Sequence, residues 1–520
     1  IWLHVSLVTL TKIIALYFYG TRNFKYWEKR GVKFEKPLIF VGSNLKMFID
    51  NVSVSERFAA LYRSYPNERF VGFFEGNGPG LLIRDPELIK RILVTDFRYF
   101  HQRGLNPHKT VIEPLLRNLF TADGDLWKLM RQKLTPTFSS GKLKAMFPLI
   151  VERTEKLAKI ADDLAETGEE VDIRELMARY TTDFIGACGF GIDSTALNDE
   201  NSDFRKLGKS IFNITKRDHF VSFLKRMAPE TFKNLTFLAP DIQNKTISLV
   251  RQIMGQRNYK PSGRNDFIDM MLELKQKGKI TGESVEKRNP DGTPKIVELE
   301  LDDQLLSAQV FIFFAAGFET SSSASSFLLH MLAYHPEAQE RCQKEVDEVL
   351  QRYDGKLCFE AVKEMKYMEM AFKESIRCLP SPGFLLRRAA SKYTIPDTDI
   401  TIDEDTLVII STEAMASDED YFEDPEKFIP ERFHPDNIDK IKKCTFMPFG
   451  DGPRSCIGER MGIMQSMAGV ATILRKFSVS PSRNTIRKPL IDPYSLIVQT
   501  IIGGLPLALK RRTNIKQIKY

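Results

Sequence analysis

Cysteine is scarce in this chain of 520 residues, which contains only six. They are Cys188, Cys342, Cys358, Cys378, Cys444 and Cys456. None of them has the close paired spacing of a zinc site, and their density is too low for a disulfide scaffold. The sequence therefore excludes a small disulfide-stapled or zinc-ribbon protein and predicts a reducing compartment with mostly free thiols.

Internal repeats and low-complexity tracts are also absent from the sequence. With 42% apolar and 28% charged residues, the chain can bury a large core, which excludes a disordered or fibrous protein. The formal net charge of +7 is modest for this length, and such an excess usually serves solubility. We expect no nucleic-acid partner, whereas an anionic protein or membrane surface is compatible with this charge.

The N-terminus lacks the pattern of a cleaved signal peptide. Residues 1–20 are apolar except for His4, Lys12 and some hydroxyls, and the basic residues lie behind this run. We expect a membrane anchor over 1–20, truncated at its start, then a basic linker and hinge over 21–44 and a large domain over 45–520. Because Lys12 interrupts the apolar run, an amphipathic surface helix is the alternative.

Helical patterns dominate the large domain, and short strand patterns flank them. Strands are expected near Phe70–Phe74, Gly80–Ile83, Thr394–Ile400, Thr406–Ile410 and Leu496–Leu509. The polar segment Lys287–Pro294, with its Pro-Asp-Gly, is expected to be an exposed loop. The predicted fold class is therefore mainly α with a minor β region.

One predicted helix is unusually long. Its periodicity begins at Asp303, with another Asp before it as a cap, and ends at Tyr334, ahead of His335-Pro336. Its first half, Leu305–Phe318, is apolar nearly all round, as in a helix through the middle of a large core. A transmembrane span is the alternative, but about 14 apolar residues ending in Glu319 are too few.

The segment Phe449–Gly458 carries the most specific pattern in the chain. It is Phe-Gly-Asp-Gly-Pro-Arg-Ser-Cys-Ile-Gly, and a helix with one apolar face follows it. Cys456 therefore precedes a helix N-terminus, where the dipole and free amides favour a thiolate. Gly450 and Gly458 permit tight turns that bring amides near the sulfur, and Arg454 can meet a carboxylate. An isolated Cys is more often a small core residue, but so long a pattern rarely arises by chance.

This pattern resembles the cysteine-ligand loop of the cytochrome P-450 haem monooxygenases. Further segments resemble other motifs of that family, namely Trp127–Arg131, Ala316–Thr320, Glu374–Arg377 and Pro430–Phe433. The resemblance covers essentially the whole chain and is most like insect microsomal, xenobiotic-metabolising members. It implies the cytochrome P-450 fold, with haem b (iron protoporphyrin IX) held through the sulfur of Cys456.

The resemblance also implies the residues that hold the cofactor. A buried haem needs cations or strong donors for its two propionates. Trp127 and Arg131, at i and i+4, share a helical face, and the family pattern adds Arg387 and Arg454. A surface ion pair of little energy is the alternative for any one arginine. The other expected cofactor contacts are Phe449, Gly317, Gly450 and Gly458.

Thr320 and Glu319 are the expected catalytic residues, since proton delivery to a buried iron requires a hydroxyl and a carboxylate, through water. Gly317 is expected to leave room beside the iron and to mark a local break in the helix. The alternative for Thr320 is a hydroxyl bonded back to its own helix.

Glu374 and Arg377 stand at i and i+3, a spacing that usually gives an exposed surface contact. The resemblance instead implies a buried structural network that Arg432 completes behind the cysteine loop.

Substrate contacts are expected at Phe311, Phe314 and Ala315 of the long helix, although a single aromatic is more often a core residue. The stretches Phe97–Phe120 and Phe212–Phe237 resemble variable substrate-facing loops. The edge of the second is expected to dip into membrane lipid.

The implied reaction inserts one atom of O2 into an apolar small molecule and reduces the other to water. Electrons would come from NADPH through NADPH–cytochrome P-450 reductase, with cytochrome b5 as a second donor. The reaction would take place at the cytosolic face of the endoplasmic reticulum.

The basic residues expected at the docking face for the electron donor are Lys128, Lys133, Lys142, Lys144, Lys442, Lys443 and Arg460. Solvated surface charge is the alternative for them.

Two other functions stay open at this point. One is a haem-thiolate isomerase or dehydratase that needs neither O2 nor a reductase, against which the pair Glu319-Thr320 argues. The other is a non-catalytic haem-binding protein. The sequence does not identify the substrate.

Overall fold

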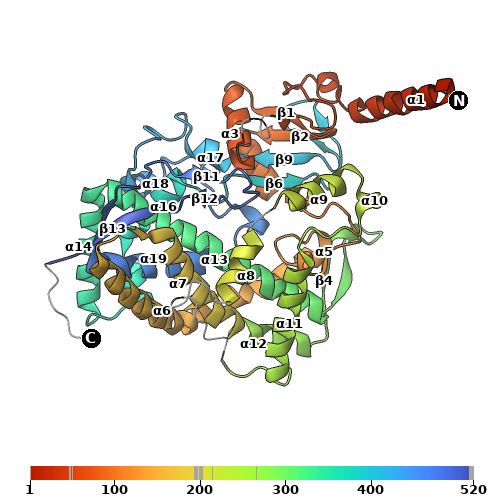
Figure 1. Ribbon diagram of the computed structural model, residues 1–520. Helices are drawn as coiled ribbons and strands as arrows, with labels where there is room; N and C mark the ends of the chain where they lie inside the picture. The colour runs from red at the N-terminus through yellow and green to blue at the C-terminus, as the bar shows by residue number, and fades with distance from the viewer. Residues whose placement is uncertain are drawn as a thin grey trace.

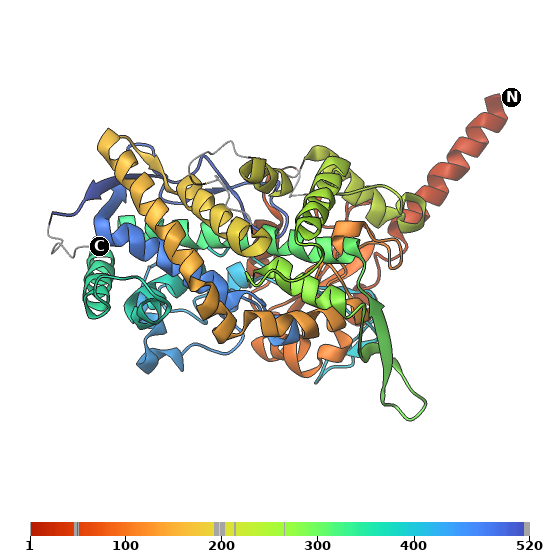
Figure 2. The same cartoon turned by 90° about the horizontal axis from the view of Figure 1, so that it is seen from below.

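The long helix predicted from the sequence forms the centre of the molecule. The computed structural model describes residues 2–45, 49, 51–191, 197, 203–212, 215–264 and 266–513. In it, α13 (Asp303–Tyr334) runs through the middle of the structure (Figure 2). The carboxylate of Asp302 caps it by accepting from the amide of Leu305 at 2.6 Å, and the next helix begins at Pro336. Both predicted ends are confirmed.

Several helices pack around α13 (Figure 1). They are α6 (Ser140–Thr167), α7 (Ile173–Ile185), α11 (Pro240–Gln256), α14 (Pro336–Arg352), α16 (Lys366–Cys378) and α19 (Glu459–Lys476). One apolar cluster unites them and includes Leu306 of α13, Tyr180 of α7 and Val470 of α19. Most of these helices bury one apolar face, whereas α13 is buried along most of its circumference, as the all-round apolar pattern predicts.

Shorter helices complete the α region. They are α1 (Trp2–Thr21), α3 (Val54–Ser64), α4 (Pro86–Lys90), α5 (Gly124–Leu134), α8 (Asp203–Phe212), α9 (Lys216–Met227), α10 (Pro229–Phe232), α12 (Phe267–Gln276), α15 (Phe359–Glu364), α17 (Thr412–Ala416) and α18 (Pro435–Ile438). Two 3-10 turns matter for the site, η4 (Pro114–Arg117) and η7 (Pro430–Phe433).

The largest sheet lies at one end of the molecule, beside α3 (Figure 1). Its strand order is β1-β2-β9-β6, with β1 (Phe70–Glu75), β2 (Gly78–Ile83), β9 (Leu407–Ile410) and β6 (Leu385–Arg388). β2 pairs antiparallel with β1 and parallel with β9. The remaining short strands are β3 (Val171–Asp172), β7 (Tyr393–Thr394), β8 (Thr401–Ile402), β10 (Phe477–Pro481), β11 (Leu490–Ile491), β12 (Ile501–Ile502) and β13 (Pro506–Arg511). The prediction of a mainly α fold with a minor β region is confirmed.

A β-hairpin that the sequence did not predict flanks the polar segment 287–294. β4 (Lys279–Arg288) and β5 (Pro294–Glu300) pair antiparallel and project from the body of the molecule (Figure 2). The predicted exposed loop forms the tip, where the amide of Asn289 donates to the carbonyl of Thr293 at 2.8 Å. β4 is mostly polar, so no apolar alternation marks it in the sequence.

Helix α1 extends away from the rest of the chain (Figure 1). Its described side chains are largely exposed, among them Leu16 at 56% and Phe18 at 66%. By length and composition, α13 is the one helix among the described residues that is apolar enough to cross a membrane, and 72% of its apolar window is buried, as in a core helix. A membrane anchor over residues 1–20 therefore stays a prediction.

Candidate haem site

The segment Phe449–Gly458 folds into a tight loop ahead of α19. Gly450 and Gly452 have φ angles of +71° and +70°, a region that favours glycine. A side chain at Gly452 would also come within 1.9 Å of the carbonyl oxygen of Leu93. The amide of Cys456 donates to the carbonyl of Phe449 at 2.8 Å. The loop is thus closed on itself and holds the cysteine in front of the helix.

Cys456 faces a cavity of about 940 Å³, which Trp127, Arg131 and Phe138 also line. Burial raises the pKa of the Cys456 thiol, although the amide of Gly458 hydrogen-bonds the sulfur and, like Arg131, lowers that pKa. The amide ahead of the helix therefore favours the thiolate, as expected, while desolvation opposes it.

Four arginines gather beside the loop, namely Arg103, Arg131, Arg387 and Arg454. Asp123 is the carboxylate among them, and its Oδ1 accepts from Nη2 of Arg454 at 2.9 Å and from the amide of Arg103 at 2.7 Å. Burial, reinforced by neighbouring arginines, lowers the pKa of Arg103 to about 10 and that of Arg387 to about 9. These guanidiniums therefore share a buried region with an excess of positive charge.

This arginine cluster fits a ligand that carries two carboxylates. Nε of Arg387 and Nη1 of Arg454 are buried without a hydrogen-bond partner among the described residues. Buried guanidinium groups normally bond to anions, and Asp123 balances only one of the four charges. The residues present thus fit the propionate end of a haem, whose iron the nearby Cys456 would hold.

The other expected cofactor contacts border this cluster. The guanidinium carbon of Arg454 lies 4.2 Å from the ring centroid of Trp127, a cation–π contact that supports the arginine. Nη1 of Arg131 donates to the carbonyl of Ser455 at 2.8 Å and so ties α5 to the loop. Phe449 is half-buried against the main core, and Gly458 is the N-cap of α19. Direct contact of these side chains with a macrocycle stays a proposal.

Glu374 lies at the centre of a buried ion network. Nε and Nη2 of Arg377 donate to its two carboxylate oxygens, each at 2.8 Å. Nε of Arg432, in η7, donates to Oε1 at 3.2 Å, and the amide of Ile429 donates to the same oxygen at 3.0 Å. Burial alone would lower the pKa of Arg377, but its hydrogen bonds to Glu374 raise that pKa. The structure thus brings the three expected residues together in the core, not at an exposed helix surface.

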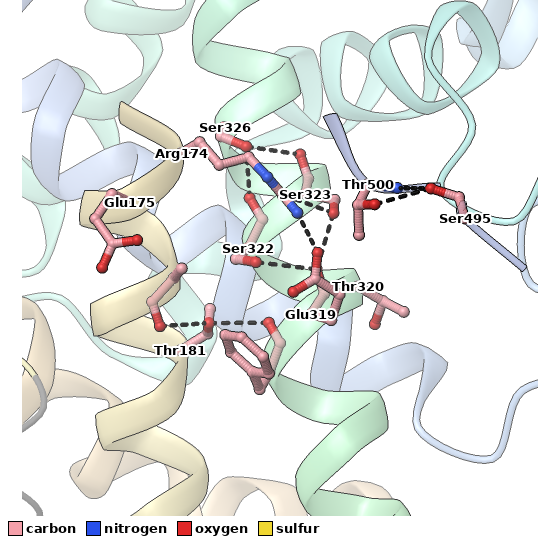
Figure 3. Close-up of polar contacts among 12 residues, drawn as sticks. Arg174, Glu175, Thr181, Glu319, Thr320, Ser322, Ser323, Ser326, Ser495 and Thr500 are labelled. Carbon is pink, nitrogen blue, oxygen red and sulfur yellow. Dashed lines mark hydrogen bonds and ion pairs between the residues drawn. The ribbon is translucent and has the colours of Figure 1, made fainter. Parts of the chain in front are cut away.

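Thr320 and Glu319 point in different directions from α13 (Figure 3). Oγ1 of Thr320 donates to the carbonyl of Ala316 at 2.6 Å, which is the back-bonded alternative. Glu319 is 5% exposed and forms an ion pair with Arg174 of α7, which also donates to Oγ of Ser323 at 2.7 Å. Arg174 thus holds Glu319 on the α7 side, and the expected catalytic role of Thr320 and Glu319 stays a prediction.

Gly317 lies at the contact of α13 with α7. A side chain there would come within 2.3 Å of Cδ1 of Ile185 in α7, so the glycine permits close approach of the two helices. α13 is continuous from Asp303 to Tyr334, so the predicted helix break at Gly317 is wrong. Room beside the iron at Gly317 stays a prediction. The accessible position is Ala316, which is exposed although it lies in the middle of α13.

The expected substrate residues separate into two groups. Phe314 is 1% exposed and packs edge-on against Phe190 at a ring distance of 5.5 Å, and Ala315 is 4% exposed. Both are buried in the core. Phe311 is 5% exposed and belongs to a small separate cluster with Leu115, in the first stretch expected to face substrate. Substrate contact at the three residues stays a prediction.

Three charged residues of the site were not predicted, namely Arg103, Asp123 and Arg174. Asp123 stands four residues before Trp127. Its charge in a short polar turn is the sequence feature that could have identified it as a site residue. Arg174 gives no local signal, since its partner Glu319 is 145 residues away.

Comparison with known proteins extends this picture to the whole chain. A family model described as cytochrome P-450 matches residues 32–503. Cytochrome P-450 6B6 of Helicoverpa armigera is 38% identical over 484 residues, which cover 93% of this chain and 93% of that protein. Cytochrome P-450 6a2 of Drosophila melanogaster is 36% identical over 513 residues, which cover 97% and 98%. Cytochrome P-450 6B1 of Papilio polyxenes is 35% identical over 512 residues, which cover 97% and 99%.

Proposed function

Because this chain belongs to the cytochrome P-450 family, and so is a haem-thiolate monooxygenase, we propose that it oxidises apolar xenobiotics or endogenous lipophiles with O2 and with NADPH-derived electrons. The proposed cofactor is haem b, with Cys456 as the protein ligand of its iron. The observation that carries this proposal is the arginine cluster beside Cys456, in which buried guanidinium nitrogens of Arg387 and Arg454 lack partners among the described residues.

The chain's own residues would divide the work around the cofactor. When bound, the haem supplies the activation of O2 for insertion of one oxygen atom into the substrate. Cys456 would hold the iron, and Arg131, Arg387 and Arg454 would hold the propionates. Oγ1 of Thr320, on the same side of α13 as the accessible Ala316, would hold a proton for delivery through water.

Replacement of Thr320 by alanine is expected to uncouple electron use from product formation. The yield of product per NADPH should fall about tenfold and hydrogen peroxide should rise, because proton delivery loses its hydroxyl. Substrate binding, read from the haem absorption shift, should stay as in the wild type. Ser325→Ala is the matched control, since Ser325 also bonds back to its own helix, at 2.6 Å from the carbonyl of Ser321. Unchanged coupling in Thr320→Ala would contradict the role.

A basic surface near Cys456 would receive the electron donor. Its residues are Lys128, Lys133, Lys142, Lys144, Lys442, Lys443 and Arg460. Lys128 and Arg460 line the same cavity as Cys456, and Lys128 and Lys144 form ion pairs with Glu283 and Glu360. Charge of this sign supports docking of NADPH–cytochrome P-450 reductase through an acidic face, with cytochrome b5 as a second donor.

Reconstitution with reductase and NADPH tests the proposed function. Incubation with plant toxins, insecticides and hormone-like lipophiles should give products that depend on both O2 and NADPH. The rate of haem reduction should fall about tenfold from low to high salt, because screening weakens charge-steered docking. Product formation from peroxides without NADPH would favour an isomerase, and substrate binding without any product would favour a haem-binding protein.

Two neighbouring apolar features support a membrane location. Nδ2 of Asn23, just after α1, donates to the carbonyl of Asn77 at 3.0 Å, so the end of α1 is fixed to the β1–β2 turn. Met227, at the end of α9, lies beside Gly76 of the same turn. Phe220 and Phe223 of α9 are 60% and 44% exposed. We therefore propose that the enzyme lies on the cytoplasmic face of the endoplasmic reticulum and receives apolar substrates from the lipid.

A further inference from the structure

The β4–β5 hairpin is fastened to α5, a helix of the candidate haem site. Oγ of Ser284 donates to Oδ1 of Asp125, in the first turn of α5, at 2.7 Å. The amide of Val285 donates to the same oxygen, also at 2.7 Å. A side chain at Gly282 would come within 2.6 Å of Cδ2 of Leu129, so β4 packs directly on the helix. The root of the hairpin is therefore fixed relative to the haem site.

The root also borders the cavity in front of Cys456. Val285 lines this cavity together with Lys128 and Arg460 of the basic surface. Nζ of Lys128 lies 3.7 Å from Oε2 of Glu283 in β4, so the hairpin and the basic surface are in contact. An electron donor that covers the basic surface would therefore lie beside the hairpin.

The outer part of the hairpin, residues 287–295, is exposed almost throughout and projects from the body of the molecule (Figure 2). From Val285 to the turn at Asp291 the chain advances about 20 Å, at about 3.3 Å per residue. A protein interface of about 800 Å² on each partner is about 32 Å across if it is circular. The turn therefore lies near the rim of a partner that is centred on the cavity.

The turn is held by hydrogen bonds of its own. Nδ2 of Asn289 donates to Oγ1 of Thr293 at 3.0 Å, and the amide and hydroxyl of Thr293 donate to Oδ1 of Asp291 at 2.9 and 2.6 Å. Gly292 has a φ angle of +84°, in the region that favours glycine. An ordered turn loses less conformational entropy on binding than a loose loop, so this turn is preorganised for contact with a partner.

The charges of the outer part are unbalanced. Three exposed cations stand in it, namely Lys287, Arg288 and Lys295. Asp291 is the one carboxylate between 287 and 295, and it already accepts two hydrogen bonds from Thr293. Among the described residues Arg288 and Lys295 form no ion pair, whereas the carboxylates of Glu283 and Glu298, nearer the root, are both paired with lysines. The outer part therefore presents positive charge to a partner.

We propose that the outer part of the hairpin is a second contact for the flavoprotein electron donor, separate from the basic surface around Cys456, and that its three cations bind an acidic side of that protein. Because these charges lie at the rim, they act on the rate of association and not on electron transfer within the complex. The attachment to α5 keeps them at a constant distance from the cavity. This inference rests on the proposed function, in which a reductase supplies the electrons.

Stopped-flow reduction of the full-length, haem-loaded protein by NADPH–cytochrome P-450 reductase tests this contact. In the triple variant Lys287→Gln, Arg288→Gln and Lys295→Gln, the rate of haem reduction at limiting reductase should fall about fivefold. The rate at saturating reductase should stay as in the wild type, because electron transfer within the complex is unchanged. At high salt the triple variant and the wild type should reduce at the same rate, because screening removes the attraction.

A second triple variant supplies the matched control. Arg483→Gln, Lys488→Gln and Lys510→Gln removes the same charge from three exposed residues in β13 and in the segment after β10. β13 lies across the molecule from β4 (Figure 1). The control should therefore be reduced as fast as the wild type at every reductase concentration.

Charge reversal is a second route to the same result. With Lys287→Glu, Arg288→Glu and Lys295→Glu, the rate at limiting reductase should fall further than with glutamine, because repulsion replaces attraction. Wild-type rates in both variants, or an equal loss in the matched control, would overturn the contact alone. It would also be overturned if the variants slowed only reduction through cytochrome b5 or lost only self-association, since the cations would then serve another partner. Absence of any NADPH-dependent haem reduction in the wild type would overturn the proposed function as well.

Discussion

Replacement of Cys456 by alanine is expected to abolish monooxygenase activity and to remove the spectral signature of a thiolate-bound iron. The loop from Phe449 closes on Cys456 through a 2.8 Å backbone bond, and Cys456 lines the cavity, so alanine would remove the atom proposed to bind the iron. Electron donation by the sulfur is what distinguishes this haem from one held by histidine. The measurement is the absorption of the reduced protein under carbon monoxide, in which the long-wavelength band should disappear.

A second cysteine supplies the control for this experiment. Cys358 is half-buried, and its sulfur accepts from the amide of Ala361 at 3.4 Å, a weak cap of α15. Cys358→Ala should therefore keep the long-wavelength band and the activity of the wild type. Retention of the band in Cys456→Ala would contradict both the identity of the iron ligand and the account of the cavity built on it.

The parts of the site that the sequence predicts are those with local signals. The loop around Cys456 carries glycines at positions with positive φ angles, and α13 carries its own cap at Asp302 and its own stop before Pro336. The contact between Glu374 and Arg377 is likewise encoded by their spacing on α16. Each of these features depends on residues close together in the chain, so that pattern and structure agree.

The parts that the sequence does not predict depend on tertiary neighbours. The close approach of Ile185 to Gly317 and the ion pair of Arg174 with Glu319 both arise where α7 crosses α13, more than a hundred residues away in the chain. Helical periodicity shows that a residue is buried but not which segment covers it, and so the contact of Phe314 with Phe190 could not be predicted. The raised pKa of the Cys456 thiol is also a tertiary effect, because burial by surrounding segments outweighs the nearby amide of Gly458.

The second large effect is expected at Glu374, whose replacement by glutamine should leave little folded, haem-loaded protein. Glu374 is fully buried and accepts from Arg377, Arg432 and the amide of Ile429. Removal of its charge would leave two guanidiniums without their carboxylate. The free energy of unfolding should therefore fall by about 3–5 kcal/mol, which is a large part of the stability of a typical domain. The network lies between α16 and η7, and the segment from η7 leads toward the cysteine loop, so haem incorporation should fall with the folded fraction.

Glu369 provides the matched control, because it lies on the same helix but near the surface, where it pairs with Lys373 at 2.8 Å. Glu369→Gln should lower the free energy of unfolding by no more than about 1 kcal/mol and leave the haem content unchanged. The measurements are the yield of soluble protein, the haem-to-protein ratio and the thermal unfolding midpoint of each variant. A normal haem-to-protein ratio and a normal thermal unfolding midpoint in Glu374→Gln would mean that the buried pairs with Arg377 and Arg432 do not hold α16 against η7. The structural role assigned to these pairs would then be wrong.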